Sequence, residues 1–249
     1  MIKAVIFDIY GTLLKTETGD LDDSLEEEEL LLKSFSRVKE KYDLEASSEH
    51  LLELFEDNID KVHQEKEKKG IEHPEVNIVE IWGMILDEIG HEHDEDLLVE
   101  IAYDHNHFNG KHILYPSAED TLKELKKKAK LGIVSNAQFY TLIDMDNLLD
   151  AKLEDYFDED ILLFSYKIGF SKPNVEVFLM LKEKLKEKGI DASEAIYVGN
   201  DMLKDIEASK KAGFKACLFE SPEVRLRKGE VDVEPDYRIK KLKEILKII

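Results

Sequence analysis

The chain has 249 residues, of which 43% are hydrophobic and 37% charged, as is typical of a globular protein with a substantial core. Its 35 basic and 56 acidic residues give a net charge of −21, which disfavours binding to nucleic acid or to an anionic membrane. The single cysteine excludes an internal disulfide, and we find neither a signal-peptide pattern nor an apolar run that could cross a bilayer. We therefore expect a cytoplasmic protein.

Segments 1–17 and 113–249 alternate short apolar runs with amphipathic helices, a pattern that predicts an α/β fold with a doubly wound parallel sheet. The expected strands are Ala4–Phe7, Leu131–Ser135, Ile161–Phe164, Ala195–Val198 and Phe214–Phe219. The expected helices are Ala118–Lys128, Phe139–Leu149, Val175–Lys188 and Leu203–Ala212. Because crossovers in such sheets are right-handed, the carboxyl ends of these strands should meet at one edge.

Segment 18–112 has a different pattern, with helical periodicity and no convincing strand. Its expected helices are Leu25–Tyr42, Ser48–Lys69, Val76–Ile89 and Glu95–Phe108. Because the segment follows the first strand directly, we predict an inserted helical cap domain that acts as a lid over the same edge of the sheet.

Four polar motifs follow expected strands of the core. Asp8 comes directly after the first strand, at the position where open α/β sheets bind ligands. The motifs are Asp8-Ile9-Tyr10-Gly11-Thr12, Ser135-Asn136, Lys172-Pro173, and Gly199-Asn200-Asp201 with Asp205 four residues further on. In this order and spacing the motifs resemble the haloacid dehalogenase superfamily, and the insertion point resembles that of its helical type 1 cap. The resemblance implies a hydrolase that acts on a small-molecule substrate.

The residue types suit covalent catalysis by a carboxylate. Asp8 would attack an electrophilic centre and form an aspartyl intermediate that water then hydrolyses. The hydroxyls of Thr12 and Ser135, together with backbone N–H groups near Gly11 and Asn136, would hold the developing anion. Lys172 would orient Asp8 and offset negative charge in the transition state.

The acidic residues of the fourth motif indicate a metal site. Asp201 and Asp205 together with Asp8 form a set of hard oxygen ligands that suits Mg²⁺. The resemblance implies that the backbone carbonyl of Tyr10 is a further ligand. The family's usual aspartate after the glycine is replaced by Asn200, so either Asn200 or Asp201 could face the ion.

Tyr10 stands where phosphatases of the family carry a second aspartate that transfers protons. A phenol with an ordinary pKa near 10 is a poor base at neutral pH. One reading is therefore a 2-haloacid dehalogenase, since halide needs no proton and the D-x-Y-G-T form resembles those enzymes. Against it, their fourth motif differs, and the one cap arginine, Arg37, lacks their local pattern. We favour a Mg²⁺-dependent phosphatase, and keep a non-catalytic binding protein as a third hypothesis.

Other candidates in the cap receive structural interpretations. The pairs His91 with His93 and His105 with His107 are two residues apart and would face different sides of a helix, so they do not indicate a zinc site. Trp82 lies in an apolar helical pattern and is expected in the cap core. The oligomeric state and the identity of the substrate are not encoded in any motif that we recognise.

Overall fold

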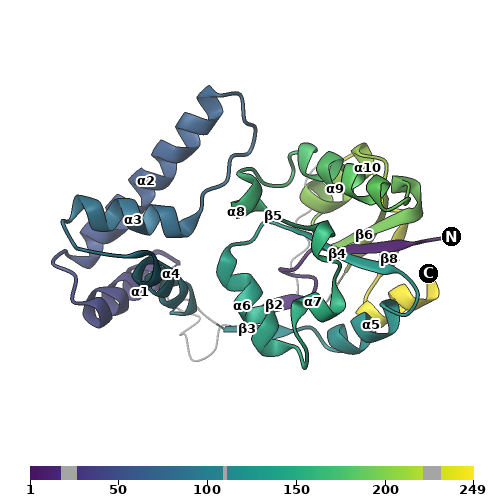
Figure 1. Ribbon diagram of the computed structural model, residues 1–249, viewed down its shortest axis with the longest axis horizontal. Helices are drawn as coiled ribbons and strands as arrows, with labels where there is room; N and C mark the ends of the chain where they lie inside the picture. The colour runs from purple at the N-terminus through teal and green to yellow at the C-terminus, as the bar shows by residue number, and fades with distance from the viewer. Residues whose placement is uncertain (18–26, 109–110, 221–230) are drawn as a thin grey trace. The chain divides into compact units, whose positions relative to one another are not determined.

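A computed structural model describes residues 1–17, 27–108, 111–220 and 231–249 (Figure 1). Contacts within this part of the chain define two compact units. One unit comprises Met1–Lys15 and His112–Ile249, and the other comprises Thr16–Lys111. We refer to them as the core unit and the helical unit.

The core unit is built on a parallel six-stranded sheet in the order β5-β4-β1-β6-β7-β8. Its strands are β1 (Ala4–Phe7), β4 (Lys130–Ser135), β5 (Leu162–Phe164), β6 (Ala195–Gly199), β7 (Lys215–Phe219) and β8 (Tyr237–Ile239). All five strands predicted from the sequence are present, and the predicted α/β class with a parallel sheet is confirmed. The edge strand β8 was not predicted, because only Ile239 of its three residues is buried and the apolar signal is weak.

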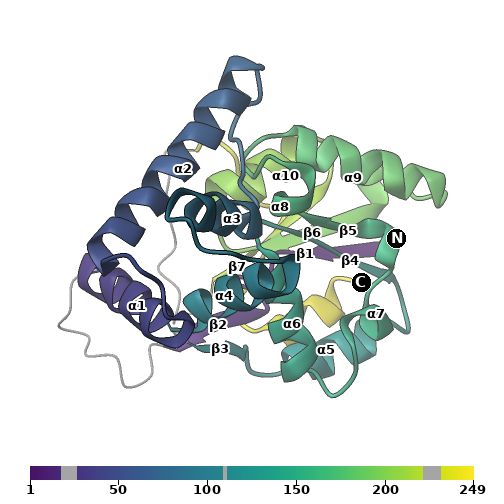
Figure 2. The same ribbon diagram turned by 60° about the vertical axis from the view of Figure 1, so that its left-hand side comes forward.

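Both faces of this sheet are buried, which explains why its strands are apolar runs. Along β1, Val5 and Phe7 pack in one hydrophobic cluster, and Ala4 and Ile6 pack in the other. The first cluster is covered by α5 (Ala118–Leu125), α6 (Phe139–Leu148), α7 (Leu153–Tyr156) and the 3₁₀ turns of Leu242–Lys247. The second is covered by α9 (Glu176–Glu187) and α10 (Ala208–Lys211) (Figures 1 and 2).

Several core helices begin or end differently from the prediction. The predicted helix Leu203–Ala212 begins with a wider π-helical turn, Met202–Glu207, before α10. The single-turn helices α7 and α8 (Ser165–Ile168) are too short to give a periodic signal and were not predicted. A 3₁₀ turn at Glu159–Ile161 delays β5 by one residue.

The helical unit contains α1 (Glu27–Tyr42), α2 (Ser48–Lys68), α3 (Ile78–Glu88) and α4 (Glu95–His107). These correspond to the four predicted cap helices, although the predicted start of the first, Leu25, lies outside the described residues. Trp82 is fully buried among the rings of Phe35, Phe55 and His105, as expected for a core residue. No helix in the described ranges is both long and apolar enough to span a bilayer.

Two short strands stand where the chain passes between the units. They are β2 (Leu14–Glu17) and β3 (Lys111–Leu114), and they pair with each other in a separate two-stranded sheet. Neither strand was predicted, because each has only four residues of mixed polarity and shows no regular alternation of apolar and polar residues.

Candidate active site

Asp8 is held in a tight turn at the carboxyl end of the central strand β1. Its backbone N–H donates to the Val198 carbonyl of β6 over 2.9 Å, which extends the sheet ladder by one residue. The chain then turns, with the N–H groups of Leu13 and Leu14 both donating to the Ile9 carbonyl. Gly11 has a φ of +77°, a conformation that favours glycine. Asp8 is buried, with its side chain 9% exposed.

Two donors converge on one oxygen of Asp8. Oδ1 accepts from Ser135 Oγ at 2.9 Å and from Lys172 Nζ at 2.8 Å. Burial raises the pKa of Asp8 to about 6, with the neighbouring ammonium of Lys172 opposing that rise. Asp8 is therefore ionised at neutral pH yet more basic than an ordinary aspartate. No hydrogen bond to Oδ2 is found among the described residues.

Lys172 is positioned by a reciprocal pair of hydrogen bonds from Asn136. The Lys172 N–H donates to Asn136 Oδ1 at 2.8 Å, and Asn136 Nδ2 donates to the Lys172 carbonyl at 2.9 Å. Asn136 was predicted to bind substrate; in the structure both polar atoms of its amide bond to the backbone of Lys172 and so fix the segment that carries the lysine.

The ammonium of Lys172 lies between two carboxylates. Besides Asp8, Nζ donates to Asp205 Oδ1 at 2.6 Å, and the hydroxyl of Tyr197 accepts a third bond at 2.7 Å. Burial acts to lower the pKa of Lys172, but Asp205 and Asp8 outweigh it and the pKa is raised. The lysine is therefore charged although it is only 3% exposed.

Asp205 also organises the loop that follows β6. Its Oδ2 accepts from the backbone N–H groups of Asn200 and Asp201 at 3.0 and 2.9 Å. Gly199 permits this approach, because a Cβ there would lie 2.4 Å from the Asp205 carboxyl carbon. With Lys172 on Oδ1, both oxygens of Asp205 are engaged.

Asn200 and Asp201 have different surroundings, and the difference bears on the alternative left open by the sequence. Asp201 caps the following helix, with its Oδ1 accepting from the N–H groups of Leu203 and Lys204, both at 2.9 Å. The side chain of Asn200 packs against the Asp8 turn, since a Cβ on Gly11 would lie 2.4 Å from Asn200 Nδ2.

Tyr10 belongs to a buried polar cluster on the core unit. Its hydroxyl lies 2.7 Å from the hydroxyl of Thr141 on α6, and its ring contacts that of His112 with centroids 5.0 Å apart. His112 Nδ1 lies 2.6 Å from Oδ2 of Asp144, one turn beyond Thr141 on α6. Burial raises the pKa of Tyr10 to about 12, so its phenol stays protonated at neutral pH.

Tyr197, Thr141 and Asp144 were not predicted from the sequence, although they form hydrogen bonds with residues in or beside the candidate site. Tyr197 lies in the middle of an apolar strand, and Thr141 and Asp144 lie inside a helix, so no local pattern distinguishes them from core or surface residues. Thr12, which was predicted in the site, is fully buried, and its hydroxyl has no hydrogen-bond partner among the described residues.

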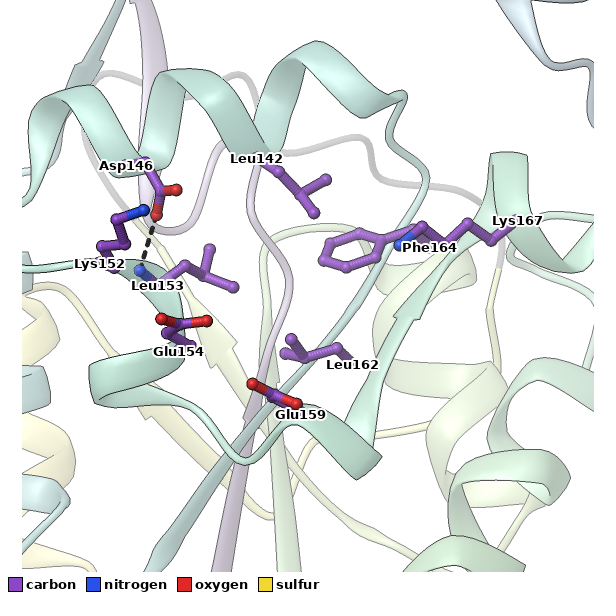
Figure 3. Close-up of a pocket in the computed structure, with 9 residues that line it drawn as sticks. All are labelled: Leu142, Asp146, Lys152, Leu153, Glu154, Glu159, Leu162, Phe164 and Lys167. Atoms are coloured by element: carbon purple, nitrogen blue, oxygen red, sulfur yellow. Dashed lines mark hydrogen bonds between the residues drawn. The ribbon is translucent and has the colours of Figure 1, made fainter.

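A pocket of about 450 Å³ lies elsewhere on the core unit, beside the edge strand β5 (Figure 3). Its apolar lining comes from α6, α7 and β5, and Lys152, Lys167 and three carboxylates line the rest. None of the predicted site residues lines it. We therefore locate the candidate site by the hydrogen bonds around Asp8 and not by this cavity.

The oxygen donors around Asp8 suit a hard cation that keeps several water ligands. Three-residue clusters of acidic, histidine or cysteine side chains able to hold a metal are absent from the described ranges. Mg²⁺, however, needs only one or two carboxylates beside waters and neutral oxygens. Asp8, the Tyr10 carbonyl and the Asn200 amide are donors of that kind, so the residues present fit the ion.

Several curated relatives share one name, glyceraldehyde 3-phosphate phosphatase. A glyceraldehyde 3-phosphate phosphatase of Methanopyrus kandleri is 26% identical over the whole of this chain and 97% of its own length. One of Methanocaldococcus jannaschii is 33% identical over 141 residues, which are 54% of this chain and 56% of that relative. This second match therefore spans only about half of each protein.

Solved structures share the fold at lower identity. A 2-haloacid dehalogenase from Pseudomonas syringae pv. Tomato superposes with a TM-score of 0.66 at 23% identity, covering 100% of this chain and 98% of that one. At this identity the similarity establishes the fold alone. The model of one protein family, the haloacid dehalogenase-like hydrolases, matches residues 2–213, which are most of the sequence. The chain therefore belongs to the haloacid dehalogenase-like hydrolases.

Proposed function

We propose that this protein is a phosphatase that transfers the phosphoryl group of a small phosphorylated metabolite to water, with Asp8 as covalent nucleophile. The observation that carries the proposal is the buried Asp8 carboxylate, with Ser135 and Lys172 on one oxygen and no hydrogen bond to the other among the described residues. The names of the relatives at full and half coverage point to a phosphate ester as substrate.

In this proposal the hydrogen bonds on Oδ1 set the direction in which Oδ2 faces the substrate. Ser135 and Lys172 hold the carboxylate, and Lys172 offsets the charge of an incoming phosphoryl group. This compensation matters because the chain carries a net charge of −21 and repels anions at long range. The backbone N–H groups of Gly11 and Thr12, which the sequence placed in the anion site, donate instead to the carbonyls of Leu14 and Ile9, so we assign no anion contact to them.

Mg²⁺ fits the proposal as a resident cation. We assign Asp8, the backbone carbonyl of Tyr10 and Asn200 as its protein ligands, with Asp201 as the alternative to Asn200. When bound, the ion would neutralise phosphate charge beside Asp8. Asp205 was predicted as a ligand as well. Because both of its oxygens are engaged, we assign it to holding Lys172 and the loop after β6.

The helical unit is proposed to serve as the lid and to select the substrate.

A 2-haloacid dehalogenase is the second candidate, and Tyr10 is the observation that favours it. With its pKa raised to about 12, the Tyr10 phenol is a much weaker acid than a carboxyl group and would give an alkoxide leaving group little assistance, whereas a halide needs none. The phosphatase is expected to need Mg²⁺ and a phosphate ester, whereas the dehalogenase is expected to need a 2-haloacid and no metal.

The deciding experiment measures phosphate release from a panel of phosphate esters with Mg²⁺, and chloride release from 2-chloropropionate without it. We expect phosphate release that is lost in Asp8→Asn and kept in Glu29→Gln, a matched removal of a carboxylate from the helical unit. Chloride release alone would overturn the phosphatase proposal. If both assays are silent while inorganic phosphate still raises the melting temperature, the non-catalytic binding function is supported instead.

A further inference from the structure

Tyr197 places a hydroxyl inside the hydrogen-bond network under Asp8. The residue lies on β6 and is fully buried. Its hydroxyl lies 2.8 Å from the Val134 carbonyl, 3.2 Å from Asp205 Oδ1 and 2.7 Å from Lys172 Nζ. A phenol has one hydrogen, and the shorter contact assigns it to the Val134 carbonyl. Tyr197 therefore accepts from the ammonium of Lys172.

This bond completes the coordination of Lys172. An ammonium has three N–H donors, and three acceptors lie within 2.8 Å of it: Asp8 Oδ1, Asp205 Oδ1 and Tyr197 Oη. Two of the acceptors are charged, and the third is a neutral group on the central part of the sheet. With all three in place, the ammonium has a single orientation.

The ring of Tyr197 also contributes to the placement. Lys172 Nζ lies 5.3 Å from its centroid, within the range of a cation–π contact. Phe178 of α9 packs edge-on against the same ring, with centroids 4.9 Å apart and an interplanar angle of 88°. Tyr197 is thus fixed by the packing of the sheet, and a phenylalanine would keep that packing while losing only the oxygen.

We propose that Tyr197 is a positioning residue for the hydrolysis assigned to this site, because its hydroxyl fixes the Lys172 ammonium on Asp8. The inference rests on the proposed phosphatase function. Without the hydroxyl, Lys172 would keep two acceptors and could turn towards Asp205. Asp8 would then lose part of its orientation and charge compensation in the chemical step, whereas substrate binding would change little.

The test compares Tyr197→Phe with Tyr156→Phe in the full chain. Tyr156, on α7 of the core unit, donates to Glu119 of α5 at 2.5 Å. Neither helix carries a residue of the candidate site. With a phosphate ester that the wild type hydrolyses, we expect kcat to fall by about 10-fold or more in Tyr197→Phe while KM stays within about twofold. Tyr156→Phe should leave both constants unchanged.

A spectroscopic readout separates this inference from the proposed function. The buried Lys172 ammonium should exchange its hydrogens slowly and give a protected ¹H–¹⁵N signal, which Tyr197→Phe should broaden or shift. An unchanged signal together with an unchanged kcat would overturn the inference. If the wild type hydrolyses no phosphate ester, the proposed function fails, and the ammonium signal still decides whether Tyr197 positions Lys172. Should Tyr197→Phe not fold, 3-fluorotyrosine incorporation weakens the acceptor and should move the same signal less far.

Discussion

Lys172 lies 2.6 Å from Asp205 and 2.8 Å from Asp8, so one buried ammonium compensates two buried carboxylates. A buried charge that loses its partner costs far more than an exposed one, because water cannot replace the lost interaction. We therefore expect the group of Asp8, Asp205 and Lys172 to contribute to stability and, under the proposed function, to the reaction.

Replacing the lysine should expose this dependence. In Lys172→Met we expect the free energy of unfolding to fall by about 3–5 kcal/mol, because Asp8 and Asp205 are left uncompensated. Phosphatase activity should be lost. Urea denaturation measures the first effect and phosphate release the second. Lys123→Met is the matched control, since the Lys123 side chain is 42% exposed and its ion pairs with Glu119 and Asp150 should contribute less than about 1 kcal/mol. Equal losses in the two variants would contradict the interpretation.

The identity of residue 10 should control how activity depends on the leaving group. Because a phenol whose pKa is raised to about 12 is a weak proton donor, under the proposed function kcat/KM of the wild type should fall steeply as the pKa of the leaving alcohol rises across aryl and alkyl phosphates. Tyr10→Asp should flatten this dependence by raising the rates for alkyl phosphates by about 10²-fold. Tyr10→Phe, which keeps the ring beside His112, should leave the slope unchanged. A flat dependence in the wild type would show that another group supplies the proton.

Substitutions after Gly199 should reveal which side chain faces the cation. Asn200→Asp adds a carboxylate next to Gly11, and we expect it to lower the Mg²⁺ dissociation constant by about 10-fold. Asp201→Asn keeps a side chain that can cap the helix and should leave Mg²⁺ affinity unchanged. Isothermal titration with Mg²⁺ alone measures both without substrate. The reverse pattern would assign the ligand to Asp201.

Acidification should destabilise the helical unit through His105. Burial among aromatic rings lowers the pKa of His105 from 6.5 to about 4, so the folded state favours the neutral ring. The resulting contribution to the free energy of unfolding is fully present above pH 6.5, the pKa of the unfolded histidine. It is lost as pH falls towards 4, and the loss is at most about 3 kcal/mol.

Trp82, the single tryptophan, lies 5.3 Å from that ring, and its fluorescence during urea denaturation reports the change. His105→Phe should remove this pH dependence between 6.5 and 4. His50→Phe replaces a histidine whose side chain is 54% exposed and should retain it. Persistence of the full dependence in His105→Phe would contradict the assignment.

Features with a local sequence signal were predicted correctly. The buried strands are apolar runs, and the polar residues at their carboxyl ends gather because parallel strands end at one edge. Asp8, Ser135, Lys172 and Asp205 accordingly form one hydrogen-bonded group.

Features that depend on tertiary contacts were not accessible from the sequence. Tyr197 lies within an apolar strand, and its role arises only from the proximity of Lys172, 25 residues away along the chain. The same holds for the contact of Tyr10 with Thr141, which are 131 residues apart. The separate surroundings of Asn200 and Asp201 follow from the way the loop wraps Asp205, which no pattern of residue types encodes.

The pairing of β2 with β3 has a consequence for how such proteins diversify. The chain leaves the core unit along β2 and returns along β3. Because these two strands pair, the two points where residues 16–111 join the core unit lie next to each other. Any segment whose ends meet at that spacing could replace residues 16–111 without altering the register of the six-stranded sheet. If the helical unit selects the substrate as proposed, reaction chemistry and substrate choice are encoded in separable stretches of sequence, and a chimera carrying another helical insert between these two strands should retain the hydrogen bonds around Asp8.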